Sequence, residues 1–435
     1  MNRHSRKAAG ESWFARQKTA LRRVFLHPET LVVLAAIILW TVEFRRIEEQ
    51  LPILGGIQLG IHRLLTSLNP IPRHVQFVLS VEVDDATFYN APLNGGTPTN
   101  RRFLADVIRQ AAAGGAAVIG LDFALRSPAW QAGDLAARAD DDRWLADTVA
   151  KVISGGTPVV MTTGFVISGP KSWVREPTIF NDYPPQPELV ELGPPPKGVR
   201  VGFINLPLDV RQIPLRVVAI EPDRISKKEF LSFALQLVDA FEEVRHATKR
   251  SKDQPPISQM EENEFVYGYF FPESKFETKV SAGTLVRSGP QSPQQFRDRI
   301  VIIGGTWNNS AVGRGPRVDT HPSPVGDMPG LYLHADYVEA LLQHAFARPV
   351  PEWLSISLEM VLWVLLYWAF HMTPVKQRLA LLLILALPMF VAYILLTHWA
   401  IYLDAVIPAT GFFIHLLGKH YFGLRERAEE KAVKD

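Results

Sequence analysis

The sequence contains no cysteine among its 435 residues. That absence excludes a disulfide framework, a thiolate nucleophile and every cysteine-ligated metal or iron–sulfur centre. Several catalytic motifs are missing too: there is no Gly-x-Ser-x-Gly elbow, no lysine-bearing phosphate loop and no pair of histidines at metal-ligand spacing. We therefore expect no catalytic activity, no bound metal and no cofactor.

An excess of positive charge is confined to three short segments. Residues 1–28 carry seven Lys or Arg against one acid, and residues 371–378 carry two Lys or Arg and no acid. The tail, residues 419–435, has five basic and four acidic residues, which leaves the rest of the chain with a formal net charge of −7. Nucleic-acid binding needs a basic surface to neutralise phosphates. We therefore exclude nucleic acid as a partner.

Long apolar runs occur near the C-terminus. Residues 379–396 are 18 residues without a charge, and as a helix they would cover roughly 27 Å, close to the thickness of a bilayer's hydrocarbon core. The neighbouring runs are interrupted only by Glu359 on one side and by Asp404 on the other. We expect membrane-spanning helices joined by short loops over residues 353–371, 379–397 and 399–418.

A shorter apolar run near the N-terminus is open to more than one interpretation. Only 13 uncharged residues lie between Glu29 and Glu43, a length that also suits a signal peptide or a buried core helix. No small-residue cleavage site follows, which favours an uncleaved signal anchor over residues 29–47.

The charge bias decides between three spans and four. With four spans, every short basic segment faces the cytoplasm, whereas three spans would put the two basic termini on opposite sides of the lipid bilayer. We expect a multi-pass protein of the plasma (inner) membrane. The tails 1–28 and 419–435 then lie in the cytoplasm and residues 48–352 lie outside.

The large segment between the spans has the pattern of a parallel β-α-β unit. A β-branched stretch over 75–83 predicts a strand, Asn100 is placed to cap a helix over 101–113, and the apolar run 116–123 predicts a second buried strand. We predict an α/β domain with a mostly parallel mixed sheet. The further predicted elements are helix 140–153, strand 157–163, helix 228–244, strand 299–305 and helix 331–346.

Two stretches of this domain are predicted to lack regular structure. Residues 169–198 are rich in proline, which removes backbone donors and breaks helices. Residues 246–263 are polar and poor in aromatic residues, which indicates an exposed insertion.

A series of motifs in this domain resembles a known family. The motifs are VEVDDATF at 81–88, PTNRRFLADVIRQAAAGGAAVIGLDFALRSP at 98–128, VGFINLPLDVRQIPLRV at 201–217, FRDRIVIIGGTWNNSAVG at 296–313 and MPGLYLHADYVEALLQ at 328–343. Their order is similar to that of the second-class CHASE domain, a sensory extracellular domain associated with cyclases and histidine kinases. The resemblance spans roughly residues 30–420 and includes one span before the domain and three after it.

The resemblance implies a membrane-anchored sensor that binds a small ligand or a protein partner and works as a homo-oligomer. Family members usually continue into a cyclase, a histidine kinase or a kinase-like effector, whereas 17 residues follow the last predicted span here. We therefore expect the output to pass through a separate effector protein. The alternative function is a structural scaffold subunit of an envelope complex.

Charged residues at the predicted strand ends are the candidate ligand site. Asp84 and Asp85 follow the first strand, Asp122 ends the second, and Arg101 and Arg102 begin the helix between them. Open α/β sheets place ligand sites at such strand ends. The alternative is that these groups cap helices or pair with one another to order the loops, which is common for strand-end acids.

Two further interpretations assign histidines to a metal site or glycines to a phosphate-binding loop. A hydrolase would use the three aspartates as magnesium or calcium ligands, joined by His321 or His334. We instead interpret His334 as the helix-start histidine shared with the family, making a local hydrogen bond. GGTWNNS at 304–310 follows a strand and could form a phosphate loop, but a tight turn is the simpler reading.

Three acids fall near the outer ends of the predicted spans: Glu43, Glu359 and Asp404. An intramembrane acid is a functional candidate, and a transporter would use such groups along its pathway. The alternative is that each reaches interfacial water or pairs with Arg45 or Arg46. We favour this alternative because four spans make a thin pathway unless the protein oligomerises.

Overall fold

The computed structural model contains two compact units. It describes residues 52–68, 74–95, 100–123, 125, 135–163, 165–169, 172–175, 198–207, 209–221, 224–249, 264–276, 279–292, 294–309, 316–370 and 373–403. The larger unit, Thr66–Arg348, is called the α/β unit here. The smaller, called the terminal unit, combines Met1–Leu65 with Pro349–Asp435.

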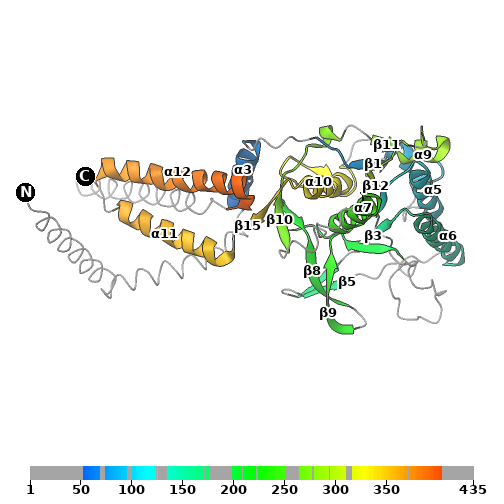
Figure 1. Ribbon diagram of the computed structural model, residues 1–435, viewed down its shortest axis with the longest axis horizontal. Helices are drawn as coiled ribbons and strands as arrows, with labels where there is room; N and C mark the ends of the chain where they lie inside the picture. The colour runs from blue at the N-terminus through cyan, green and yellow to red at the C-terminus, as the bar shows by residue number, and fades with distance from the viewer. Residues whose placement is uncertain are drawn as a thin grey trace, which may run out of the picture. The chain divides into compact units, whose positions relative to one another are not determined.

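A six-stranded sheet forms the centre of the α/β unit (Figure 1). Every pair of neighbouring strands in it is parallel, which confirms the predicted mostly parallel sheet. The order across the sheet is β11 (Lys279–Ser281), β1 (Val78–Val83), β12 (Ile300–Gly305), β2 (Val118–Asp122), β3 (Val159–Thr163) and β6 (Arg200–Phe203).

Helices cover both faces of this sheet. The first face packs against α7 (Phe233–Lys249) and α10 (Gly330–Leu342) through residues such as Val78 and Ile300. The second packs against α5 (Arg101–Ala113), α6 (Leu135–Ser154) and α9 (Ala282–Ser288) through the alternate residues, such as Leu79 and Val301. Because side chains alternate along a strand, these near-continuous apolar runs bury both faces.

Local chemistry explains why α5 begins and ends where the sequence predicts. Asn100 Oδ1 accepts a hydrogen bond from Phe103 N at 3.1 Å, which satisfies one of the free donors of the first turn. At the other end Gly115 adopts a φ of +84°, a conformation that glycine enters at no steric cost.

Three predicted helices have different bounds in the structure, and the helix predicted over 140–153 begins earlier, at Leu135. Helix 228–244 begins later, because residues up to Leu231 form β9 (Arg224–Leu231), antiparallel to β8 (Arg216–Glu221). Ser232 then starts α7, since its Oγ accepts from Leu235 N at 3.2 Å. The helix predicted over 331–346 ends at Leu342.

A short antiparallel sheet and a hairpin account for the chain around α10. After α10, β15 (Phe346–Pro349) pairs antiparallel with β10 (Phe265–Gly268), which also pairs with β7 (Gln212–Pro214). Before α10, β13 (Thr320–His321) pairs antiparallel with β14 (Met328–Pro329).

The proline-rich segment is partly ordered, so that prediction was wrong at its start. β4 (Phe165–Gly169) and β5 (Ser172–Arg175) pair antiparallel, and β5 joins β8 in a second sheet. The pairing supplies the backbone partners that the segment's composition did not indicate. Residues 176–197 and 250–263 lie outside the described residues.

The terminal unit contains α3 (Pro52–Ser67), α11 (Glu352–Phe370), α12 (Pro374–Trp399) and the short strand β16 (Ile401–Tyr402). α11 and α12 pack together through apolar residues that include Ala369 and Ile384. Pro374 occupies the first turn of α12, where its missing N–H costs nothing. α11 overlaps the span predicted over 353–371, and α12 overlaps the one predicted over 379–397 but begins earlier, at Pro374.

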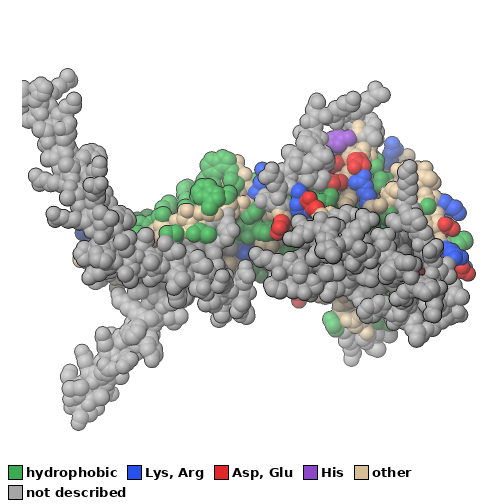
Figure 2. Space-filling model, turned by 90° about the horizontal axis from the view of Figure 1, so that it is seen from below, with side chains coloured by type: hydrophobic (Ala, Val, Ile, Leu, Met, Phe, Trp, Pro, Cys, Tyr) green, Lys and Arg blue, Asp and Glu red, His purple; other side chains and the backbone are tan. Residues whose placement is uncertain are grey.

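Among the described helices, one is long and apolar enough to cross a membrane, over Val375–Trp399. Figure 2 shows hydrophobic side chains gathered over the C-terminal helices. In α11 and α12, Trp368, Leu383 and Phe390 are each more than 60% exposed. The span predicted over 29–47 and most of that over 399–418 lie outside the described residues.

A buried glutamate ties α10 to the start of β1. Glu339 is fully buried, and its Oε1 accepts hydrogen bonds from the backbone N–H groups of Gln76, Phe77 and Val78 at 3.0, 2.6 and 2.7 Å. Its Oε2 accepts from Gln343 Nε2 at 2.6 Å. Burial raises the pKa of Glu339 above its ordinary value, although these hydrogen bonds act in the opposite direction.

Replacing Glu339 by alanine should destabilise the α/β unit strongly. The change leaves three backbone donors without their acceptor, and an unsatisfied buried donor costs about 1–3 kcal/mol. We expect a loss of about 3 kcal/mol in the free energy of unfolding, measured by urea titration of the full chain. Glu243→Ala is the matched control, because Glu243 is an exposed helical glutamate paired with Arg200. Equal losses in the two variants would contradict the role given to Glu339.

Candidate functional site

The candidate site lies at the carboxyl ends of β1, β12 and β2. β1 leads through α4 (Asp85–Phe88) and α5 to β2, and β2 leads through α6 to β3, so both connections cover the second face. β12 leads instead to α10 on the first face. The connections of neighbouring strands therefore leave the sheet on opposite sides. Open α/β sheets bind ligands beside such a switch point.

Strand register places two carboxylates on either side of a glycine. Glu82 of β1 pairs with Gly304 of β12, and Gly304 pairs with Asp122 of β2. Residues in register on parallel neighbours point to the same face, so Glu82 and Asp122 both face the α10 side. A Cβ on Gly304 would lie 3.0 Å from Leu331 Cδ1 and 3.3 Å from Asp122 Oδ2. Leu331 of α10 therefore fills the space above Gly304, between the two carboxylates.

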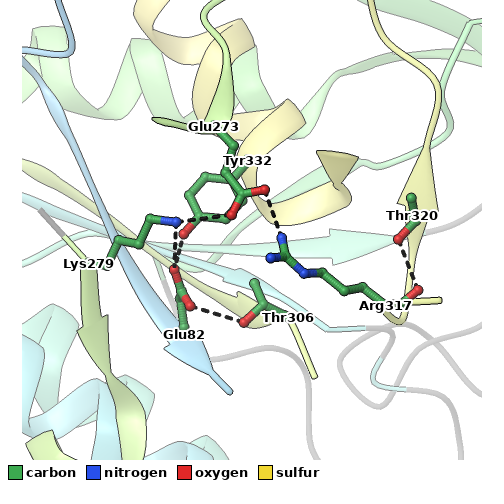
Figure 3. Close-up of polar contacts among 7 residues, drawn as sticks. All are labelled: Glu82, Glu273, Lys279, Thr306, Arg317, Thr320 and Tyr332. Carbon is green, nitrogen blue, oxygen red and sulfur yellow. Dashed lines mark hydrogen bonds and ion pairs between the residues drawn. The ribbon is translucent and has the colours of Figure 1, made fainter. Parts of the chain in front are cut away.

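Glu82 is held by hydroxyl groups and a lysine (Figure 3). Thr306 Oγ1 donates to Glu82 Oε2 at 3.1 Å, Tyr332 OH donates to Oε1, and Lys279 Nζ lies 4.0 Å from Oε1. Burial raises the pKa of Glu82 above its ordinary value, with Lys279 and the Thr306 hydrogen bond acting in the opposite direction.

Two basic side chains converge on Glu273, next to Glu82 (Figure 3). Lys279 Nζ lies 3.0 Å from Glu273 Oε1, and Arg317 Nη1 lies 2.7 Å from Oε2. Burial alone would raise the pKa of Glu273, but the hydrogen bonds from Lys279 and Arg317 hold it below its ordinary value. Lys279 Nζ also lies 4.6 Å from the ring centroid of Tyr332. This network brings together β1, β11, α10 and the loop that follows β12.

Asp122 is surrounded by a different set of groups. Its half-buried carboxylate interacts electrostatically with Asp319 and His321, and burial together with Asp319 raises its pKa to about 8. His321 Nε2 lies 2.6 Å from Asp319 Oδ1, and that hydrogen bond raises the pKa of His321. His334 of α10 is buried near the same pair, and burial lowers its pKa to about 4.

A comparison with protein-family models identifies the family to which the chain belongs. The family model of the CHASE2 domain matches residues 31–370. The chain belongs to the CHASE2 family. No curated protein and no solved structure matched it. CHASE2 domains are extracellular sensory domains, so the resemblance drawn from the sequence is confirmed over residues 31–370 and supports a sensory role.

The predicted site aspartates of the CHASE2 domain point in different directions. Asp84 caps α4, accepting from Thr87 N at 2.8 Å. Asp85 accepts from Asn308 N and Asn308 Nδ2, both at 2.6 Å, and so holds the loop after β12. Only Asp122 lies among the groups that surround Asp319.

The two predicted site arginines belong to the contact between α5 and α6. Arg101 Nε lies 3.0 Å from the buried Asp142 Oδ1, and Arg102 Nε lies 2.5 Å from Asp141 Oδ1. The structure therefore does not bring these arginines together with Asp122. Their contacts order the two helices on the second face.

The remaining predicted residues have varied outcomes. His334 Nδ1 has no hydrogen-bond partner among the described residues, so a local hydrogen bond of the predicted kind would have to use Nε2. Within the same residues, no three His, Asp or Glu side chains are grouped so that they could hold a metal ion. Glu43, Asp404 and the side chain of Glu359 lie outside what the structure describes.

Sequence reasoning missed Glu82, Glu273, Lys279, Arg317 and Tyr332. Only Glu82 had a local signal, because it is the one charged residue inside the β-branched run that forms β1. A charge within a buried strand needs a partner, which is a reason to suspect a site.

The raised pKa of Asp122 predicts a dependence of stability on pH. The folded-state pKa of about 8 exceeds the ordinary value of 3.8, so the folded protein binds the proton more tightly. The contribution of Asp122 to the free energy of unfolding is therefore fully present below about pH 4 and is lost as the pH rises toward 8. Relative to Asp122→Asn, the wild type should lose up to about 1.4 kcal/mol per pH unit in this window.

Urea unfolding at pH 5, 6, 7 and 8 measures this difference. Asp106→Asn is the control, since Asp106 lies on the exposed side of α5 and pairs with Arg109. Its stability should follow that of the wild type. Parallel curves for the wild type and Asp122→Asn would show that Asp122 keeps an ordinary pKa.

Proposed function

We propose that this protein is a membrane-anchored sensor whose CHASE2 domain lies outside the cytoplasm and binds a small ligand. The observation that carries the proposal is the group of charged and hydroxyl side chains at the carboxyl ends of β1, β12 and β2. It lies at the switch point of the sheet, where open α/β folds bind ligands.

The terminal unit supports the membrane anchor. α11 and α12 expose large apolar side chains along their length, among them Trp353, Val361, Leu379 and Leu387. An exposed apolar surface of this kind marks contact with lipid or protein. The cytoplasmic location of the basic segments rests on the positive-inside rule.

The chain itself supplies a short route from the site to the anchor. α10 carries Tyr332 and His334 at the site, and Glu339 ties it to β1. α10 ends at Leu342, β15 follows, and α11 begins at Glu352. A ligand that shifts α10 would act on the segment leading directly into α11. A separate effector protein that contacts the spans or the cytoplasmic tails would then produce the output.

Single cysteines test the proposed topology. Since the chain has none of its own, Ser292→Cys in the exposed turn after α9 and Ser5→Cys in the N-terminal tail each provide one reactive thiol. In intact spheroplasts a membrane-impermeant maleimide should label Ser292→Cys at once. It should label Ser5→Cys only after permeabilisation. The reverse pattern, or equal labelling of both, would refute an extracytoplasmic domain.

Gentle purification from the native membrane tests the separate effector. We expect a cyclase, a kinase or another signalling protein at a stoichiometric level, identified by mass spectrometry. A secretion or envelope apparatus in its place would instead support the scaffold function. Recovery of the chain alone would count against an effector in trans.

A further inference from the structure

Asp122 and His334 each interact electrostatically with Asp319 and His321, and these four residues are called the Asp122 cluster here. Leu331 above Gly304 separates it from Glu82 and the network in Figure 3. Asp122 ends β2, His321 lies in β13, Asp319 directly precedes β13, and His334 lies in the second turn of α10. Three segments distant in the sequence thus meet at the same edge of the sheet.

The start of α10 directs His334 toward Asp319. Gly330 N donates to the Asp319 carbonyl oxygen at 2.8 Å, and a Cβ on Gly330 would lie 2.1 Å from Asp319 Oδ2. The face of the helix that carries Gly330 therefore lies against Asp319. His334 lies one turn later on this face, and helical side chains lean toward the N-terminus.

His334 brings a buried polar atom without a partner. The residue is 4% exposed, and its ring packs against the rings of Phe233 and Tyr337 at centroid distances of 5.4 and 5.9 Å. Its Nδ1 has no hydrogen-bond partner among the described residues. With a pKa of about 4, the imidazole is neutral at pH 7 and keeps one acceptor nitrogen.

The Asp122 cluster contains hydrogen-bond acceptors for which the described residues provide no donor. The neighbouring hydroxyl donors, from Thr306 and Tyr332, are directed to Glu82. His321 is paired with Asp319. In the described parts of the chain no donor forms a hydrogen bond to the Asp122 carboxylate. A ligand that completes this site supplies donors and a positive charge.

We propose that the Asp122 cluster binds the primary ammonium group of a small amine. The inference rests on the sensory function proposed above and names its class of ligand. An ammonium group has three N–H donors and no acceptor, which matches the Asp122 carboxylate and the acceptor nitrogen of His334, with the negative charge of Asp319 nearby. A quaternary ammonium has the same charge but no N–H donor, so it cannot form these hydrogen bonds. An anion would be repelled by the two carboxylates.

Thermal unfolding of the full chain in detergent tests the proposal with methylammonium and ethanolamine as probes. Both should raise the unfolding temperature in a saturable way, because a ligand of the folded state stabilises it by mass action. Tetramethylammonium and potassium at the same ionic strength should not. Asp122→Asn should weaken the apparent affinity for methylammonium by about tenfold to a hundredfold, the worth of one charged hydrogen bond.

Two matched variants separate binding from folding. His334→Phe keeps an aromatic ring between Phe233 and Tyr337 and removes the nitrogen, so it should weaken methylammonium binding while retaining cooperative unfolding. Asp106→Asn makes the same chemical change as Asp122→Asn on the surface of α5, and should bind methylammonium as the wild type does.

The pH dependence of binding provides an independent readout. The charged and titratable groups that act on Asp122 are Asp319 and His321, and His334 on α10 interacts with the same two residues. Methylammonium must displace the proton that Asp122 holds below its pKa of about 8. Its apparent affinity should therefore rise about tenfold per pH unit from pH 6 and level off above pH 8. Asp122→Asn should abolish this rise.

Three results would overturn the amine site: equal stabilisation by tetramethylammonium, an unchanged response in Asp122→Asn, or no stabilisation by either amine between pH 6 and 9. Stabilisation by anionic or uncharged compounds that Asp122→Asn retains would refute the amine site and leave the sensory function standing. Failure of every compound, together with co-purification of an envelope apparatus, would refute both.

Discussion

The arrangement of the α/β unit depends on one carboxylate that three backbone amides share. Glu339 receives the N–H groups of Gln76, Phe77 and Val78, where the chain enters β1. β1 pairs with both β11 and β12, so its entry point sets the register of the sheet's centre. The same contact fixes α10 against β1. Glu82 on the strand and Tyr332 on the helix therefore meet because Glu339 holds their two elements together.

α10 carries more buried polar groups than a helix of its position needs for packing alone. Asp336 accepts from Phe271 N through both oxygens, at 2.8 and 3.0 Å, and burial raises its pKa well above its ordinary range. Each buried carboxylate is thus matched to backbone donors, as the cost of burying a charge requires. His334 Nδ1 departs from this pattern within the described residues. The exception lies beside the switch point of the sheet, where a ligand would supply the missing partner.

Local patterns predicted the elements but not the site. The cap at Asn100 and the apolar runs of β2 and β12 are local features, so their strands and helix were predictable. The start of α7 was not, because β9 exists only through its pairing with β8. The juxtaposition of Glu82, Gly304 and Asp122 depends on a strand from late in the chain lying between two early ones. No property of the residues near Glu82 or Asp122 reports that order.

The same strand order constrains how the chain can fold. β12 lies between β1 and β2, so the two strands synthesised first both lack the strand that joins them until residues 300–305 have emerged. Nearly the whole unit must exist before its central three strands close. Long-range parallel pairing of this kind is slow and leaves strand edges open in the meantime. During synthesis and any translocation, the chain therefore stays open to chaperones and proteases until its late strand arrives.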